Sequence, residues 1–372
     1  MHLCIVTHSF AKGSGQGRVN YEVIQEALAQ GIQLTLVGSD IDASLAQHPA
    51  VTWIPIAVNR WPTELLKNMV FSAKATHWLQ RHRRGFDVLK VNGAIARSPA
   101  EVNAVHFVHS AWLRSPAHTF QVRKDLYGLY QWLYTAVNAH WEKQAFQRAD
   151  TVVAVSQKIA EELVDIGVPA HRINVIINGV DPEEFSPGPS DRAALGLPEG
   201  VPLAFFAGDI QTSRKNLDTI LQALAQVPSL HLAIAGRVDG SPYPSMATSL
   251  GVAERTHFLD YRRDIAALMK AVDFFVFPSR YEACTLVLLE AMAAGLPVIT
   301  AVTAGGAELV SPESGMVLED PNDVAALADA MTTLAKEPQQ RAAMGQAARA
   351  IAVEHNWTHM AQTYVSLLCE KS

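Results

Sequence analysis

Short apolar segments alternate with helical patterns along almost the whole chain. Many of these segments are rich in Val and Ile without polar alternation, which is typical of parallel strands buried on both faces. Amphipathic helical stretches lie between them, for example at 19–30, 217–225 and 324–334. This alternation predicts βαβ units with right-handed crossovers and therefore doubly wound parallel sheets. The candidate strands are 2–6, 33–37, 51–56, 86–91, 102–108, 151–155 and 173–177, followed by 202–206, 231–235, 256–259, 274–277, 297–300 and 316–318.

One stretch interrupts this alternation. Residues 186–190 and 196–200 are rich in Pro and Gly and short of apolar side chains, which is typical of an interdomain connection. Seven candidate strands precede this stretch and six follow it, which is too many for one compact open sheet. The sequence therefore predicts an α/β fold of two Rossmann-like domains, at 1–185 and 186–355, that face each other across a cleft.

Composition narrows the class of protein. Of the 372 residues, 49% are apolar and 18% are charged, which excludes a disordered chain. A net charge of −6 argues against a nucleic-acid partner. Three scattered cysteines, Cys4, Cys284 and Cys369, are too few for a disulfide framework or a zinc site. The N-terminus lacks the features of a secretory signal. We therefore expect a cytoplasmic protein that holds no metal.

The segment 277–298 carries the clearest candidate chemistry, because a predicted strand ends there, a loop follows and a helix begins. Thr285 is the expected N-cap, and good helix formers run from Leu286. Glu282 lies in the loop, and Glu290 lies inside the helix. The unpaired N–H groups of a first helical turn favour an anion. Two carboxylates beside this positive pole suit a nucleotide-sugar. The alternative interpretation is that both carboxylates are solvated side chains.

A second candidate site lies in the loop 207–216, between a predicted strand and a helix. Arg214 can bind two phosphate oxygens at once, and Lys215 supplies a compact charge. Fixed cations of this kind can neutralise a departing nucleoside diphosphate. The alternative interpretation is a solvated surface pair.

Two candidates lie in the first half of the chain. Glycines at 13, 15 and 17 follow the first predicted strand, but their spacing does not match the Gly-x-Gly-x-x-Gly pattern of a dinucleotide site. This argues against an NAD-dependent oxidoreductase and leaves a glycine turn in which Gly15 and Gly17 allow close backbone approach. His109 follows the strand predicted at 102–108, where ligands of doubly wound sheets collect. A flexible turn and a structural histidine are the alternatives.

These residues, taken together, resemble retaining glycosyltransferases of the GT-B fold, in glycosyltransferase family 4. Glu282 and Glu290 match the Glu-x7-Glu signature of that family. The likeness is good from about residue 150 to 365 and weaker before it, and the Arg-Lys pair is similar to that of lipopolysaccharide glucosyltransferases. Further matching motifs are Val155-Ser156, Asn178-Gly179-Val180-Asp181 with Phe185, Phe206-x-Gly208, Ala235-Gly236, His257-Phe258-Leu259, Gly305-Gly306 with Glu308, and Trp357.

The resemblance implies a role for each candidate residue. Glu290 would hold the ribose of the donor nucleotide, and Glu282 would contact the donor sugar near its reacting carbon. Arg214 and Lys215 would bind the diphosphate together with the helix start at Thr285 and Leu286. The resemblance also implies that the backbone at Gly15 and Gly17 approaches the donor phosphate closely and that His109 contacts the donor sugar. It further implies that the C-terminal helix at 356–372 returns to the first domain.

The resemblance also implies the reaction, a metal-independent transfer of a hexose that needs no cofactor. A nucleotide-sugar donor, a UDP-sugar more readily than a GDP-sugar, would glycosylate a glycan or lipid-linked acceptor in cell-envelope polysaccharide or lipopolysaccharide synthesis. The chain departs from the family at Asp209, where an arginine is common, and at Cys284-Thr285, where Phe-Gly is usual, so the donor stays open. A nucleotide-sugar 2-epimerase and a non-catalytic nucleotide-sugar-binding protein are the alternatives.

Two further stretches bear on localisation. Residues 61–84 and 112–141 combine basic side chains with Trp and Tyr, a mixture that suits an anionic membrane surface. Basic residues also exceed acidic ones in 1–150, whereas acidic residues predominate in 151–372. We expect peripheral contact with the inner face of the plasma membrane through the N-terminal domain. Helices packed on the sheet with solvated outer faces are the alternative interpretation.

Overall fold

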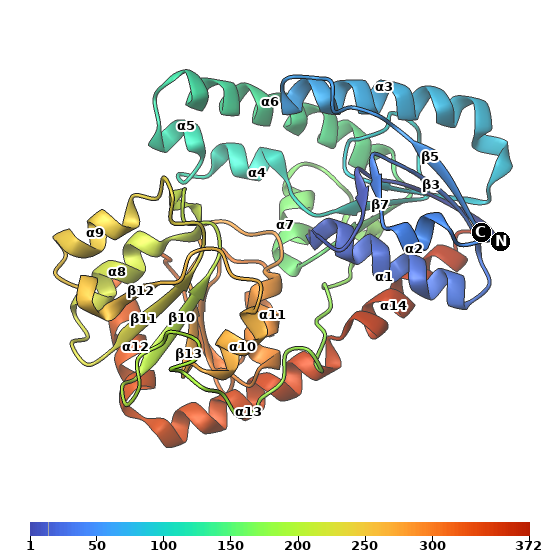
Figure 1. Cartoon of the computed structure of the whole chain (residues 1–372). Coiled ribbons are helices and arrows are strands. Elements are labelled where there is room, and N and C mark those ends of the chain that lie inside the picture. Colours follow the sequence, from blue (N-terminus) through green and yellow to red (C-terminus); the bar gives the residue numbers. More distant parts are fainter. Residues whose placement is uncertain (14) are drawn as a thin grey trace. The chain divides into compact units, whose positions relative to one another are not determined.

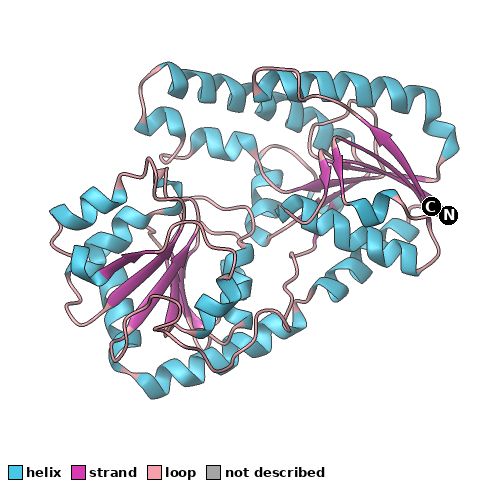
Figure 2. Ribbon diagram, in the orientation of Figure 1, coloured by secondary structure: helices cyan, strands magenta, loops and turns pink. Residues whose placement is uncertain are grey.

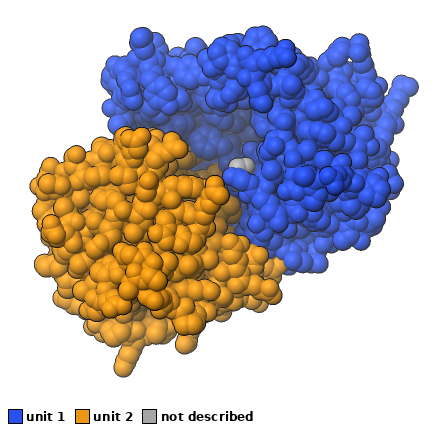
Figure 3. Space-filling model, viewed as in Figure 1, with its two compact units in different colours: residues 1–179, 357–372 blue, residues 180–356 orange. Residues whose placement is uncertain are grey.

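The computed structural model describes residues 1–13 and 15–372. These residues form two compact units (Figure 3). The first unit comprises Met1–Gly179 together with Trp357–Ser372, and the second comprises Val180–Asn356. In both units, parallel strands form a sheet that is covered by helices (Figure 2).

Within its described residues, the first unit contains a seven-stranded sheet in the order β5-β3-β1-β6-β7-β8-β9. All neighbouring strands are parallel, with His2 of β1 opposite Gln33 of β3 and Leu3 opposite Val88 of β6. Every residue of β6, β7 and β8 is buried, which accounts for their Val, Leu and Ala content, although Lys90, Asn92 and Asn103 are buried there too. The strands are β1 (His2–Val6), β3 (Gln33–Gly38), β5 (Val51–Pro55), β6 (Val88–Asn92), β7 (Val102–Val105), β8 (Thr151–Ala154) and β9 (Ile173–Val175).

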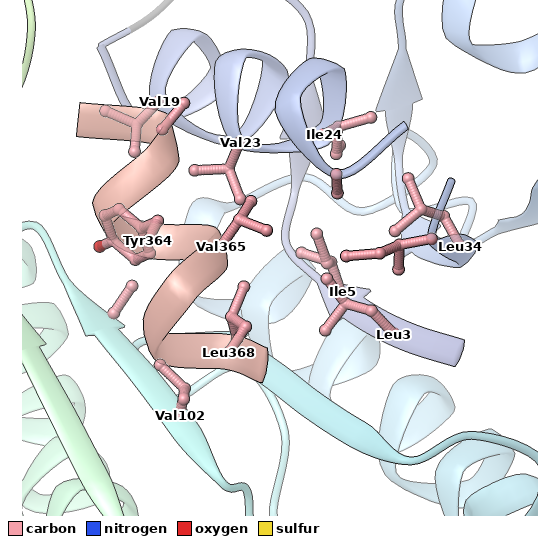
Figure 4. Packing of buried hydrophobic residues seen from close by; sticks show 14 of the residues in the cluster. Leu3, Ile5, Val19, Val23, Ile24, Leu34, Val102, Tyr364, Val365 and Leu368 are labelled. Atoms are coloured by element: carbon pink, nitrogen blue, oxygen red, sulfur yellow. The ribbon is translucent and has the colours of Figure 1, made fainter. Parts of the chain in front are cut away.

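Side chains of β1 alternate between two hydrophobic clusters, one on each face of this sheet. Leu3 and Ile5 pack with helices α1 (Gly15–Ala29) and α14 (Trp357–Cys369), as Figure 4 shows. Cys4 and Val6 pack with α3 (Glu64–His82). Successive side chains of a strand point to opposite faces of the sheet, so β1 contributes to the hydrophobic cluster on each face.

The C-terminal helix α14 belongs to the core of the first unit, although about 180 residues of the second unit separate it from β9 in the chain. Tyr364, Val365 and Leu368 of α14 are fully buried against Val19 and Val23 of α1 (Figure 4). The other helices and short elements of this unit are α2 (Ala43–Ala46), α4 (His109–Arg114), α5 (Thr119–Val122), α6 (Leu126–Arg148), α7 (Gln157–Asp165), η1 (Arg83–Gly85), η2 (Ala170–Arg172) and the paired strands β2 (Ser9–Phe10) and β4 (Asp40–Ile41).

The second unit contains a six-stranded parallel sheet in the order β12-β11-β10-β13-β14-β15. Figure 1 labels its strands β10 to β13. Its strands are β10 (Leu203–Ala207), β11 (His231–Ala235), β12 (Thr256–Phe258), β13 (Phe274–Phe277), β14 (Val298–Ala301) and β15 (Gly315–Leu318). Its helices are α8 (Leu217–Ala225), α9 (Tyr243–Ser249), α10 (Ile265–Lys270), α11 (Leu286–Ala293), α12 (Val324–Lys336) and α13 (Pro338–Glu354), with short 3₁₀ helices η3 (Ser213–Lys215), η4 (Ala253–Arg255) and η5 (Ala307–Leu309).

Each sheet has one place where the strand order reverses. In the first unit the chain proceeds outward in both directions from the pair β1 and β6, and in the second unit from β10 and β13. The connections after these two strands run to opposite sides, which opens a crevice at their carboxyl ends. Ligands of doubly wound sheets bind at such switch points, so these two edges are where candidate residues matter most.

The predicted fold class is confirmed, with seven strands in the first sheet and six in the second at the expected places. The strand predicted at 102–108 is too long, because β7 ends at Val105 and His109 begins helix α4. The predicted glycine turn is partly wrong, since Gly15 and Gly17 lie in the first turn of α1. Ser14 lies outside the described residues.

The stretch 112–141, which stands out in the sequence for its basic and aromatic side chains, is divided among the helices α4, α5 and α6. Helix α4 ends before Ser115, whose extended backbone (φ −64°, ψ 133°) is the conformation favoured before a proline. Helix α6 then begins at a strong N-cap, because the Asp125 carboxylate accepts a hydrogen bond from the backbone N–H of Gly128 at 2.8 Å. Local backbone chemistry therefore sets the limits of α4 and α6.

The Pro/Gly-rich stretch at 186–200 lies within the second unit, and so do residues 180–185. Arg349 of α13 donates to the carbonyl oxygens of Phe185 and Pro182, at 2.6 and 2.8 Å, which attaches this segment to the second unit. Among the described residues, no helix is long and apolar enough to cross a bilayer.

Candidate functional site

The candidate donor residues of the second unit lie at its switch point. Arg214 and Lys215 belong to the 3₁₀ turn η3 that follows β10, and Glu282 lies in the loop that follows β13. Because β10 and β13 are parallel neighbours, these two connections leave the sheet at the same edge. The fold therefore brings together residues that lie almost seventy positions apart in the sequence.

Asn216 fixes the turn that presents the two cations. Its backbone has a left-handed conformation (φ 64°), which costs a side-chain-bearing residue about 1–2 kcal/mol. The buried side chain offsets this cost with three hydrogen bonds. Its Nδ2 donates to the carbonyl oxygens of Pro278 and Pro321, at 2.8 and 2.5 Å, and its Oδ1 accepts from Thr219 Oγ1 at 2.6 Å. The chain therefore reverses sharply from Lys215 into α8.

Glu282 contacts both cations directly. Its Oε1 lies 2.5 Å from Lys215 Nζ and 3.3 Å from Arg214 Nη1. Burial lowers the pKa of Lys215, and the adjacent Glu282 carboxylate raises it. The ammonium of Lys215 also lies 5.1 Å from the centre of the Phe277 ring. Two cations and one carboxylate leave a net positive charge, which an anionic ligand can neutralise.

Arg280, which sequence reasoning missed, attaches the cationic turn to the loop after β13. Its Nη1 donates to the carbonyl oxygen of Ser213 at 2.7 Å, and its two terminal nitrogens donate to the carboxylate of Asp218. Its backbone N–H and the Ser279 hydroxyl both donate to the carbonyl oxygen of Arg214, at 2.9 and 3.0 Å. The sequence offered one signal for this role, which is that Arg280 lies two residues before Glu282 in the same loop.

The predicted helix start is present next to this cluster. Thr285 is the N-cap of α11, and Leu286 is its first residue, half-buried, with half-buried Glu290 on the following turn. The hydroxyl of Thr285 makes no capping hydrogen bond, contrary to the usual role of an N-cap threonine. This Oγ1 is buried and has no hydrogen-bond partner among the described residues. Buried hydroxyls are nearly always paired, so Thr285 has capacity for a ligand.

A backbone clamp holds the segment 282–285 in place. Glu282 N–H donates to the carbonyl oxygen of Thr303 at 3.2 Å, and Gly305 N–H donates to that of Glu282 at 3.0 Å. Thr285 N–H donates to Gly305 O at 2.9 Å. The loops that follow β13 and β14 therefore position the helix start as one unit.

The remaining candidates, Gly15, Gly17 and His109, belong to the first unit. A cavity of about 510 Å³ lies at the switch point of its sheet. His8 and Gln16 follow β1 in this lining, and Asn92 ends β6. The other lining residues are Ser39, Val58, Asn59, Glu64, Lys67, Asn68, Gly93, Ala94, Ile95, Ala104, His106, Phe107, His109, Tyr134, Asn138, Trp141 and Glu142.

His109 is held firmly in the wall of this cavity. Its Nδ1 lies 2.6 Å from Glu142 Oε1, and its backbone N–H donates to Glu142 Oε2 at 2.8 Å. The buried carboxylate of Glu142 thus fixes the ring and orients Nε2 as the nitrogen that can reach a ligand. Sequence reasoning did not identify Glu142, because it lies on α6, 33 residues beyond its partner.

Gly15 and Gly17 flank a residue of the same cavity. They lie in the first turn of α1, and Gln16 between them lines the cavity. Gln16 Nε2 donates to Thr7 Oγ1 at 3.2 Å, which connects this turn to the end of β1.

Two family models match the chain, one in each half. The model described as "Glycosyltransferase Family 4" matches residues 13–184. The model described as "Glycosyl transferases group 1" matches residues 189–351.

Several curated relatives are named D-inositol 3-phosphate glycosyltransferase. The protein from Xylanimonas cellulosilytica is 33% identical over 246 residues, which are 62% of this chain and 59% of that protein. The protein from Mycobacterium avium is 35% identical over 231 residues, or 59% of this chain and 54% of that protein. The chain thus spans little more than half the length of these relatives.

Solved structures of low identity share the fold over nearly the whole chain. Sucrose-phosphate synthase from Thermosynechococcus elongatus has a TM-score of 0.80 at 19% identity, with 99% of this chain and 98% of that chain covered. WaaG, a glycosyltransferase involved in lipopolysaccharide biosynthesis, has a TM-score of 0.77 at 20% identity, with 98% and 99% covered. Anabaena HepE, solved with UDP and glucose, has a TM-score of 0.72 at 23% identity, with both chains fully covered.

Proposed function

Because the chain belongs to the family 4 glycosyltransferases with a GT-B fold, we propose that it is a retaining, metal-independent hexosyltransferase. It transfers a hexose from a nucleotide-sugar, a UDP-sugar in preference to a GDP-sugar, to a hydroxyl of a glycan or lipid-linked acceptor. Its products belong to cell-envelope polysaccharide or lipopolysaccharide synthesis. The observation that carries this proposal is the contact of Arg214 and Lys215 with Glu282 at the switch point of the second sheet.

The donor diphosphate binds to Arg214, Lys215 and the start of α11. Arg214 pairs with two phosphate oxygens, and the buried ammonium of Lys215 adds a compact charge. The unpaired Oγ1 of Thr285 and the N–H groups from Leu286 onward complete the anion site. Before the donor binds, the carboxylate of Glu282 keeps Lys215 charged despite its burial, since an adjacent carboxylate favours the ammonium form.

The two carboxylates bind the ends of the donor. Glu290, on the second turn of α11, accepts hydrogen bonds from the ribose hydroxyls. Glu282 orients the hexose near its anomeric carbon and remains next to the cations that hold the diphosphate. Gly15 and Gly17 allow backbone approach to the donor phosphate, and His109 Nε2 contacts the donor hexose.

The reaction proceeds with retention. The bond between the anomeric carbon and the phosphate oxygen breaks, and positive charge develops on the sugar ring. The acceptor hydroxyl attacks from the same face, and its proton passes to the departing phosphate oxygen. Arg214 and Lys215 stabilise the negative charge that accumulates on this oxygen and its neighbours, which lowers the barrier to departure.

The experiment that tests this function supplies UDP- and GDP-sugars with a panel of glycan and lipid-linked acceptors, with and without EDTA. The expected product keeps the anomeric configuration of the donor in NMR spectra, and EDTA leaves the rate unchanged. An inverted product or loss of turnover in EDTA contradicts the mechanism. An epimerised donor in the absence of acceptor indicates an epimerase, and nucleotide binding without turnover on any acceptor indicates a binding protein.

We further propose that the first unit binds the anionic inner face of the plasma membrane. Leu126, Leu129 and Leu133 lie at helical spacing on α6, and Leu126 is 86% exposed. Exposed apolar side chains on this scale mark an interaction surface. Interfacial aromatic and basic residues beside them favour anionic lipid over a protein partner. This surface, called the α5–α6 surface below, consists of Val122, Arg123, Lys124, Leu126, Tyr127, Leu129, Trp132 and Leu133.

A further inference from the structure

A fully buried lysine contacts a residue that lines the cavity of the first unit. Lys90 occupies the middle of the central strand β6, and no part of it is exposed. Its Nζ donates to Asn20 Oδ1 at 2.7 Å and to Asn92 Oδ1 at 3.0 Å, and it lies 5.4 Å from the centre of the Tyr364 ring. Burying an ammonium is costly even when it is hydrogen-bonded. Stability alone therefore does not explain a lysine at this position.

Lys90 determines how the Asn92 amide is oriented. Lys90 Nζ donates to the amide oxygen of Asn92, which therefore faces the lysine. The amide nitrogen of Asn92 is therefore turned away from Lys90. This Nδ2 is buried, has no hydrogen-bond partner among the described residues, and belongs to a residue that lines the cavity.

A second unpaired group lies in the same lining. His106 Nε2 is buried and has no hydrogen-bond partner among the described residues. Burial and the nearby charge of Lys90 lower the pKa of His106 to about 3, so the ring is neutral at physiological pH. Because buried polar groups are almost always paired, two such groups in one cavity indicate a ligand that pairs them.

Lys67 and Glu142, which line this cavity, each contact a partner side chain. Lys67 Nζ lies 2.6 Å from Glu64 Oε1, and Glu142 holds His109. Burial lowers the pKa of His8 to about 4, so this ring is neutral as well. Within the described lining residues, every lysine or arginine is thus paired with a carboxylate. The lining contains amides and aromatic rings instead, from Gln16, Asn59, Asn68, Asn92, Asn138, Phe107, Tyr134 and Trp141.

We propose that this cavity binds an uncharged, hydroxyl-rich group of the acceptor, and that Lys90 is a positioning residue that presents the Asn92 amide to it. Amides and aromatic rings pair with hydroxyls and sugar faces, whereas the described lining offers a phosphate no lysine or arginine that lacks a carboxylate partner. The cavity therefore discriminates against a phosphorylated polyol. The identity of the cavity ligand as an acceptor rests on the proposed function, but its class as an uncharged polyol rests on the lining alone.

The test is saturation-transfer NMR of the full chain with saturating UDP, using glucose and glucose 6-phosphate, and myo-inositol and myo-inositol 1-phosphate. At least one neutral compound is expected to give a signal, at least fivefold stronger than its phosphorylated counterpart. Stronger signals from the phosphorylated compounds, or none from either neutral compound, overturn the inference. UDP titration of the same sample tests the donor site separately. Failure of the proposed cavity ligand therefore does not imply failure of the proposed donor site, and the reverse also holds.

Two variants test whether the neutral compound binds in this cavity. Lys90→Met frees the Asn92 amide to rotate. Asn92→Asp removes the hydrogen-bond donor Nδ2 from the cavity, while Lys90 still has a side-chain oxygen to which it can donate. Each is expected to weaken binding of the neutral compound at least tenfold and to leave the UDP affinity unchanged. Asn174→Asp makes the same chemical change at an exposed position on β9 and is the control. Unchanged sugar affinity in Asn92→Asp overturns the inference even if Lys90→Met fails to fold.

Discussion

Arg280 donates from Nη1 and Nη2 to the two carboxylate oxygens of Asp218, at 2.9 and 2.7 Å, and the same Nη1 donates to the backbone of the turn that carries Arg214 and Lys215. A planar guanidinium can make these contacts together, whereas a lysine cannot. The position of the two cations at the switch point therefore depends on a residue that is not itself a proposed ligand of the donor.

Replacement of Arg280 by lysine is expected to loosen this turn without removing a charge. We predict that Arg280→Lys weakens UDP binding about tenfold, which corresponds to about 1.4 kcal/mol. Isothermal titration calorimetry measures this directly. Arg262 also pairs through two nitrogens, with Asp264, at a more exposed position of the same unit, so Arg262→Lys is the matched control. Equal UDP affinities in the two variants contradict a positioning role for Arg280.

Lys90 is expected to make the free energy of unfolding rise with pH. Burial lowers its pKa in the folded protein to about 7, whereas an unfolded lysine has a pKa of about 10.4. Between these values the unfolded chain binds more protons than the folded protein, so raising the pH favours the folded state. Lys90 contributes at most about 1.4 kcal/mol per pH unit to the rise of the free energy of unfolding with pH.

Urea unfolding of wild type and Lys90→Met between pH 6.5 and 9.5 measures this effect. We predict that the wild type gains stability relative to Lys90→Met as the pH rises. Lys336→Met changes an exposed lysine at the end of α12 and is expected to follow the wild type. A constant difference between wild type and Lys90→Met across this range would show that Lys90 does not titrate in this way.

The α5–α6 surface predicts binding to anionic vesicles. Leu126→Glu combined with Leu129→Glu places two negative charges at its most exposed leucines and should abolish flotation with vesicles containing phosphatidylglycerol at low salt. Val353→Glu changes an exposed apolar side chain of the second unit and should leave flotation intact. If the wild type does not float, the proposed membrane contact is wrong.

The strands and the two sheets could be predicted because buried parallel strands leave a simple mark on the sequence. The segments that became β1, β11 and β13 match their predicted limits, since each is a mainly apolar run that ends at a polar residue, a glycine or a proline. The break between α4 and α6 could not be predicted from periodicity, because it depends on Pro116 and on the Asp125 N-cap. Local backbone preferences decide such boundaries.

The candidate site was predictable only where a residue type carries its own chemistry. Arg214, Lys215 and Glu282 stand out in the sequence as cations and a carboxylate after strands, and the structure places them in contact. Asn216, Glu142 and Lys90 were missed because their roles depend on partners that the fold supplies. An asparagine or a lysine in the sequence does not indicate that it will be buried and fully bonded.

The measurement that tests the central claim most directly is calorimetric titration of UDP into the wild type, Lys215→Ala and Lys336→Ala. Lys215 supplies a buried charge for the diphosphate, so Lys215→Ala should lower the affinity by at least a hundredfold. Lys336→Ala removes an exposed lysine of the same unit and should leave the affinity unchanged. Equal UDP affinities in all three proteins, or no UDP binding to the wild type, would contradict the assignment of this switch point as the diphosphate site.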